Sequence, residues 1–125
     1  MRPSDVVLIL ASVVLSATSQ VVLKRGMTAP AIRAAIDGGG ALDTAVAVST
    51  SPAVIGGLAC FGLSAVIWLF VLSRVALSTA YPFVALGIVL TIAAGATLFG
   101  EPVSGRALIG AALIVVGVVL VGSAA

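Results

Sequence analysis

The chain has 125 residues, of which 62% are hydrophobic and 8% are charged, and its formal net charge is +2. A water-soluble domain carries about 25% charged residues, so this chain has too few polar side chains to enclose a soluble core. The composition therefore identifies a membrane protein, and the small, scattered positive charge argues against a nucleic-acid-binding surface.

Four uncharged stretches divide the chain. A helix needs about 20 apolar residues to cross a hydrocarbon core about 30 Å thick. Short connections follow the second and third stretches, and they place consecutive spans antiparallel. We predict an all-α membrane protein with a single transmembrane domain over residues 1–125. Its four helices form an antiparallel bundle, at about residues 6–24, 53–73, 77–99 and 106–123.

The first stretch also has features of a secretory signal peptide, since Arg2 precedes an apolar run. The apolar part of a signal peptide usually has about 7–15 residues. The uncharged run at residues 6–23 is longer, and three more spans follow it. We therefore expect it to be a helix of the mature protein.

The first span carries a polar stripe. Residues four apart lie on one face of a helix, and this spacing joins Ser12, Ser16, Gln20 and Lys24. An amide facing lipid would stay unpaired, so Gln20 should face the bundle or a water-filled cleft. Two interpretations remain open. The stripe pairs helices through small polar residues, with Lys24 and Arg25 as interfacial cations, or it binds an anionic headgroup through amide, hydroxyl and ammonium donors.

The segment between the first two spans is the longest connection and is rich in Gly, Pro, Ser and Thr. Pro30 predicts the start of a short helix through Ile36, and the glycines at 38–40 predict its end. We expect this helix to lie at the membrane interface.

The distribution of Lys and Arg predicts the orientation. The first and third connections hold Lys24, Arg25, Arg33 and Arg106, whereas the opposite side holds Arg2 and Arg74. Positive residues favour the cytoplasm, so both termini are expected outside. The bias is small, and insertion in both orientations is the alternative.

The second and third spans add aromatic candidates. Ser64 and Trp68 lie four apart, and Trp68 is either an interfacial anchor or a cavity residue. Pro82 lacks an amide hydrogen and predicts a kink or a broken first turn. Tyr81 beside it is either an interfacial anchor or a donor into the cavity.

The connection before the fourth span contains Glu101 within a Gly-Glu-Pro turn. We expect a structural role for this loop, in which Glu101 pairs with Arg106 or acts near the start of the fourth helix.

Two glycines in the fourth span, Gly110 and Gly117, are seven residues apart and share a face. Glycines on one face let another helix approach closely. They mark a self-association surface, and the alternative is packing within one chain.

Motifs for catalysis and metal binding are missing. The chain has no His and a single Cys, Cys60, and its spans contain no nucleophile with a base, carboxylate pair or phosphate-binding loop. We expect no metal, no cofactor and no enzymatic activity.

The stretches AYPFVALGIVLT and LFGEPVSGRALIGAALIVVGVVLV resemble the small multidrug resistance branch of the drug/metabolite transporter (EamA-like) superfamily. This resemblance covers nearly half of the chain and implies a four-helix chain that dimerises through Gly110 and Gly117. Drug exporters of the family carry an essential Glu at the position of Ser16, where it binds cationic drugs and protons in turn. The absence of a carboxylate from the spans argues against that mechanism.

A second resemblance extends over about four-fifths of the chain. The small subunits of undecaprenyl phosphate-aminoarabinose flippases share Gln20 with Lys24, Trp68 with Leu69, residues 80–82 and residues 101–104, and the likeness ends at the long first loop.

These resemblances imply a multi-pass transporter of the bacterial inner membrane. It would flip a lipid-linked sugar, polyprenyl phosphate or related anionic amphiphile by alternating access. It would work as a homodimer or as a heterodimer with a related small subunit. The expected substrate site comprises Ser12, Ser16, Gln20, Lys24, Arg25, Ser64, Trp68 and Tyr81. The alternatives are a proton-coupled exporter of cationic compounds and a non-transporting subunit of a membrane complex.

Overall fold

The computed structural model describes residues 2–124, which form helices and turns with no β-strand among them. Four helical stretches are long and apolar enough to cross a membrane: α1, α4, the segment from α5 to α6, and α7. The predicted all-α membrane fold is therefore confirmed. In chain order the elements are α1 (Pro3–Met27), α2 (Pro30–Asp37), α3 (Ala41–Ser49), α4 (Pro52–Arg74), α5 (Leu77–Ala80), the 3-10 turn η1 (Tyr81–Phe83), α6 (Val84–Leu98) and α7 (Gly105–Ser123).

The helix starts follow from local chemistry. Proline occupies the first turn of α1, α2 and α4, where its missing N–H would have no intrahelical partner. Ser51 begins α4, and its hydroxyl accepts a hydrogen bond from the Val54 N–H at 3.4 Å. Ser104 begins α7 and accepts from the Ala107 N–H at 3.1 Å. These caps satisfy amides that would otherwise lack a partner.

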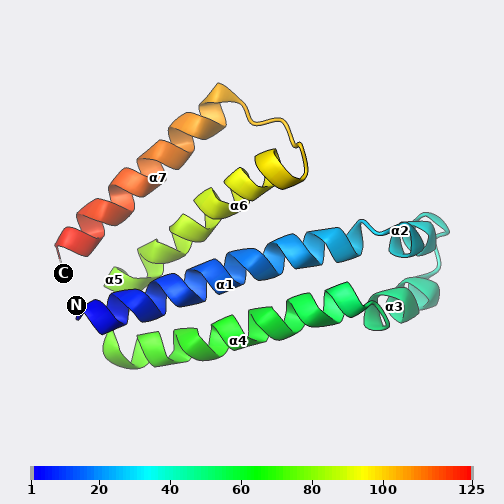
Figure 1. The fold of residues 1–125 in the computed structure, drawn as a ribbon, viewed down its shortest axis with the longest axis horizontal. Helices are drawn as coiled ribbons and strands as arrows, with labels where there is room; N and C mark the ends of the chain where they lie inside the picture. The colour runs from blue at the N-terminus through cyan, green and yellow to red at the C-terminus, as the bar shows by residue number, and fades with distance from the viewer. Residues whose placement is uncertain (1, 125) are drawn as a thin grey trace.

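The long connection between α1 and α4 holds two helices, where the sequence predicted one. The predicted helix is α2, and its Ile32 is 2% exposed. Gly39 has a φ of +73°, a conformation that glycine adopts readily, and it reverses the chain before α3. The sequence analysis assigned α3 to the loop because the Gly- and Thr-rich composition hid it. Figure 1 places both short helices beyond the ends of α1 and α4.

The third span is interrupted near its start, as Pro82 predicts. The 3-10 turn η1 separates α5 from α6 because the proline nitrogen cannot donate a helical hydrogen bond. Ala80 is fully buried and Phe83 is 8% exposed, whereas Tyr81 is 61% exposed. The turn thus directs Tyr81 away from the core.

Helices α1 and α4 form the most closely packed pair, and they run antiparallel (Figure 1). A Cβ added to Gly57 would lie 2.8 Å from Leu23 Cγ, and one added to Gly26 would lie 2.9 Å from Val54 Cγ2. Farther along the pair, the Ser12 hydroxyl donates to the Ser64 carbonyl at 2.9 Å. Small residues therefore bring the two backbones close along one face of α1.

A buried apolar cluster closes the end of the bundle that holds both chain termini. Its members include Ile9 of α1, Val71 of α4, Phe83 of η1 and Val118 of α7. A Cβ on Gly122 would lie 3.1 Å from Phe83 Cζ, so α7 approaches η1 closely here. Figure 1 shows α6 and α7 diverging from α1 toward the opposite end. We call the two ends the closed end and the open end.

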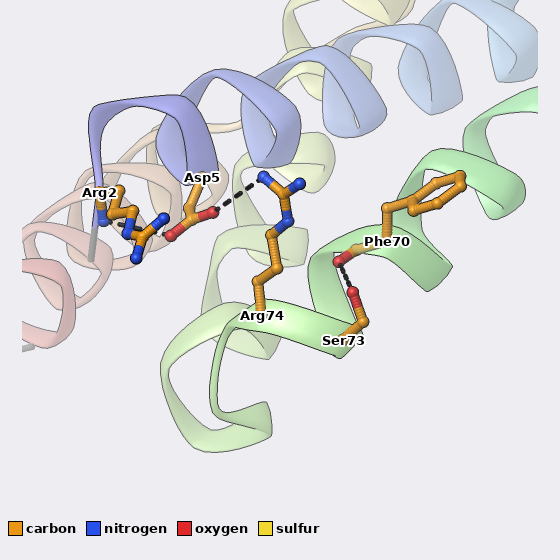
Figure 2. Close-up of polar contacts among 5 residues, drawn as sticks. All are labelled: Arg2, Asp5, Phe70, Ser73 and Arg74. Carbon is orange, nitrogen blue, oxygen red and sulfur yellow. Dashed lines mark hydrogen bonds and ion pairs between the residues drawn. The ribbon is translucent and has the colours of Figure 1, made fainter.

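An ion pair lies at the closed end (Figure 2). The Asp5 carboxylate is 5% exposed, accepts from the Arg2 backbone N–H at 3.2 Å and lies 3.9 Å from Arg74 Nη1. The predicted first span begins at about residue 6, but α1 begins at Pro3 and includes Asp5. Burial of a carboxylate is costly without a nearby cation, so Arg74 compensates its charge.

We expect Gly57→Ala to lower the free energy of unfolding by about 1–3 kcal/mol. The new methyl group would meet Leu23, including its backbone N at 3.2 Å. Gly56→Ala is the matched control, because a Cβ there meets no atom within 4 Å and alanine favours helix by about 1 kcal/mol. Equilibrium unfolding in detergent micelles measures both, and equal effects at the two positions would contradict the close approach.

We expect Arg74→Gln to lower the free energy of unfolding by about 1 kcal/mol, since a partly exposed ion pair contributes about this much. Arg74→Lys keeps the positive charge and should therefore retain most of the stability of the wild type. In an Asp5→Asn background the Arg74→Gln substitution should have little effect, because no carboxylate is left to compensate. Unfolding of the two single variants and the double variant gives the coupling between Asp5 and Arg74. If Arg74→Gln lowers the free energy of unfolding equally with and without Asp5, the pair does not stabilise the fold.

Candidate functional site

A cavity of about 620 Å³ lies between α1 and α6 toward the open end. This volume falls within the range of small-molecule sites, about 300–1,000 Å³. Polar and charged side chains line it from two directions, Ser16, Gln20 and Lys24 from α1 and Thr91 and Glu101 from α6 and the turn after it. We call this space the α1–α6 cavity.

Three of the four stripe residues face this cavity. The hydrogen bonds and ion pairs of the described residues include none from the side chains of Ser16, Gln20 or Lys24. The Thr91 hydroxyl differs, because it donates to the Ile88 carbonyl at 2.8 Å. The amide of Gln20, the ammonium of Lys24 and the hydroxyl of Ser16 are therefore the donors that a ligand in the cavity would meet.

Ser12 and Ser64 lie elsewhere. Together with Trp68 they line a second cavity of about 210 Å³. This cavity adjoins the first, because Ser16, Val84 and Gly87 line both. The Ser12 hydroxyl donates to the Ser64 carbonyl, and the Ser64 hydroxyl donates to the Phe61 carbonyl at 2.7 Å. Both protons are thus used between or within helices, which fits the helix-packing interpretation of these two serines.

Arg25 and Tyr81 are not among the residues that line either cavity. The Arg25 guanidinium carbon lies 5.6 Å from the centre of the Phe99 ring, within the range of a cation–π interaction. Phe99 itself lines the α1–α6 cavity, so Arg25 joins α1 to the end of α6 at the cavity's edge. Tyr81 is exposed near the closed end, whereas Lys24 lies at the cavity toward the open end.

Glu101 is the cavity residue that the sequence analysis assigned to a structural loop. Among the described residues the ion pair found is Asp5–Arg74, so Glu101 does not pair with Arg106. Gly100 has a φ of +63°, and the Glu101 N–H donates to the Gly95 carbonyl at 3.0 Å. The chain therefore folds back over the end of α6, which brings the carboxylate into the cavity. Gly100, next to Glu101, was the feature of the sequence that indicated a sharp turn here.

The two glycines of α7 lie on an open face. A Cβ added to Gly110 or Gly117 meets no atom within 4 Å, so these residues do not serve close packing within the chain. No group of three His, Cys, Asp or Glu side chains that could hold a metal ion occurs among residues 2–124.

Comparison with known proteins gives the family. A profile of the small multidrug resistance protein family matches residues 29–114, which is more than half of the chain. The chain belongs to this family. The matched region of this small multidrug resistance protein includes Glu101 and Gly110, whereas Ser16, Gln20 and Lys24 precede it. The family match therefore includes the α6 side of the cavity but not the α1 side, which is described by its geometry alone.

Curated relatives give a finer likeness. Proteins of Escherichia coli and of Shigella boydii serotype 18, each named as probable 4-amino-4-deoxy-L-arabinose-phosphoundecaprenol flippase subunit ArnE, are 46% identical to the chain over 66 residues. The match covers 53% of this chain and 60% of each relative, less than two thirds of the relatives' length. No solved structure matches the chain significantly. The four apolar helices and these relatives identify a multi-pass protein of the bacterial inner membrane.

Proposed function

We propose that the protein is a transporter that moves a lipid-linked sugar, polyprenyl phosphate or related anionic amphiphile between the leaflets of the inner membrane. One observation carries the proposal. Gln20 and Lys24 present unpaired donors to a cavity between two apolar helices. A phosphate or phosphodiester oxygen accepts such donors strongly, and more so where water is scarce.

The rest of the lining supports an amphiphilic substrate. Val21 of α1 and Val84, Ile88 and Ile92 of α6 present apolar side chains to the same space. An anionic headgroup would meet the polar stripe, while its lipid chain would lie along these residues and continue into the bilayer. The name of the relatives, a flippase subunit for a phosphoundecaprenol-linked sugar, agrees with this substrate class.

The shape of the bundle supports alternating access. The apolar cluster seals the closed end, whereas the cavity lies toward the open end, where α6 and α7 diverge from α1 (Figure 1). Exposing the stripe to the other side of the membrane requires α6 and α7 to rock against the α1–α4 pair. If the positive residues mark the cytoplasmic side, the open end faces the cytoplasm.

The proposal includes a partner. The open face around Gly110 and Gly117 suits a second four-helix subunit, either another copy of this chain or a related small subunit. The relatives are named as subunits, which supports an assembly. We propose that the assembly transports its substrate unchanged, with no chemical step and no cofactor.

We expect purified protein in liposomes to flip a fluorescent polyprenyl phosphate, and Lys24→Ala to reduce the initial rate at least tenfold. Loss of a hydrogen bond to a charged group, about 1.5–3 kcal/mol, accounts for this factor. Arg33→Ala is the matched control, because Arg33 is an exposed cation of α2 outside both cavities.

Gln20→Ala should reduce the same rate by about three- to tenfold, since it removes a neutral donor. Thr18→Ala, a change of an exposed residue of α1 outside both cavities, should not alter it. Proton-coupled uptake of a quaternary ammonium, with no flipping of the phosphate lipid, would identify the cation exporter instead. Flipping only after a second small subunit is added would identify a heterodimer.

We expect Gly117→Leu to weaken self-association or heterodimer formation by at least tenfold while the monomer stays folded. The added side chain would extend from the open face, where a Cβ meets no atom within 4 Å, and would obstruct the approach of a second helix. Single-molecule photobleaching in lipid bilayers measures the subunit count. Leu108→Ala, which shortens an exposed side chain on the opposite face of α7, is the control and should leave association unchanged, whereas unchanged association of Gly117→Leu would place the interface on another helix.

A further inference from the structure

The α1–α6 cavity contains charges of both signs. The Lys24 ammonium comes from α1, and the Glu101 carboxylate comes from the turn after α6. They do not form an ion pair, because within residues 2–124 the groups of opposite charge that lie within 4.0 Å are Asp5 and Arg74, at the closed end. Two unpaired, opposite charges thus face one space of about 620 Å³.

A backbone turn brings Glu101 to the cavity. Gly100 adopts a φ of +63°, which favours glycine, and the Glu101 N–H donates to the Gly95 carbonyl at 3.0 Å. The side chain then lies over Gly95, where an added Cβ would be 3.3 Å from Glu101 Oε2. A backbone turn and the missing side chain at Gly95 therefore place the carboxylate at the cavity wall.

A substrate carrying only negative charge does not explain this arrangement. A phosphate bound by Lys24 and Gln20 would be repelled by a carboxylate in the same space. The Phe99 ring on that wall already contacts Arg25. Glu101 is therefore the group in the cavity that would attract a cation, and a primary ammonium offers it charge-assisted hydrogen bonds.

We propose that Glu101 is a specificity-determining residue that binds an amine of the substrate headgroup while Lys24 and Gln20 bind its phosphate. The site then selects amphiphiles whose headgroup carries both charges over those with a phosphate alone. This inference rests on the proposed function and extends it, since a phosphate lipid without an amine would still bind the α1 side.

Binding of short-chain probes to the purified protein in nanodiscs tests the assignment. The probes are a farnesyl-phosphate-linked aminopentose, its N-acetylated twin and farnesyl phosphate. The twin keeps the size and the phosphate but lacks the positive charge. We expect wild type to bind the amine probe about tenfold more tightly than the twin, and Glu101→Gln to remove this preference without weakening the twin.

Two further variants separate the role of Glu101 from a general loss of structure. Gly95→Ala should reduce the preference for the amine probe, because the added Cβ would crowd Glu101 Oε2 at 3.3 Å. Asp43→Asn, which neutralises an exposed carboxylate of α3 outside the cavity, should leave the preference intact. Lys24→Ala should weaken all three probes.

The outcomes distinguish this inference from the proposed function. Equal binding of the amine probe and its twin by wild type, with no effect of Glu101→Gln, would overturn the role of Glu101 and leave the phosphate site standing. Binding of none of the three probes would overturn the proposed function. Tight binding of tetraphenylphosphonium that depends on Glu101 but not on Lys24 would replace it with cation export.

Discussion

The close approach of α1 and α4 is the constraint on which the rest of the structure depends. Gly26 and Gly57 allow the backbones to meet, and the Ser12–Ser64 hydrogen bond ties them where a hydroxyl would otherwise face lipid. Successive stripe residues are offset by about 40° around α1, because four residues exceed one turn of 3.6. With Ser12 held against α4, the stripe therefore winds around α1 so that Ser16, Gln20 and Lys24 face the α1–α6 cavity.

The spans and most of the stripe could be predicted from the sequence, because both follow from short-range regularities. Apolar length gives the spans, whose observed bounds differ from the predicted ones by no more than three residues. A spacing of four gives the stripe. The same spacing could not separate Ser12, which bonds to α4, from Ser16, which faces the cavity. That difference depends on where two other helices lie.

The places of Glu101, Tyr81 and Asp5 in the fold do not follow from residue type and spacing. Glu101 reaches the cavity through a left-handed glycine and a fold-back over α6, a geometry that a Gly-Glu-Pro string does not specify. Tyr81 is directed outward because a 3-10 turn rotates the chain beside Pro82. Asp5 is buried because α1 begins earlier than its uncharged core and because Arg74 ends α4 opposite it. The first two depend on local backbone conformation that residue types alone do not specify, and the third depends on a contact between residues distant in the sequence.

The contact between Arg25 and Phe99 has a mechanical consequence. A salt bridge with paired hydrogen bonds has preferred directions and is lost when its partners shift sideways. A cation above an aromatic ring is attracted by the whole face, and the attraction persists within about 6 Å of the ring centre. At 5.6 Å this contact lies near the outer limit of that range, so it joins the end of α6 to α1 without imposing one fixed orientation on the two side chains.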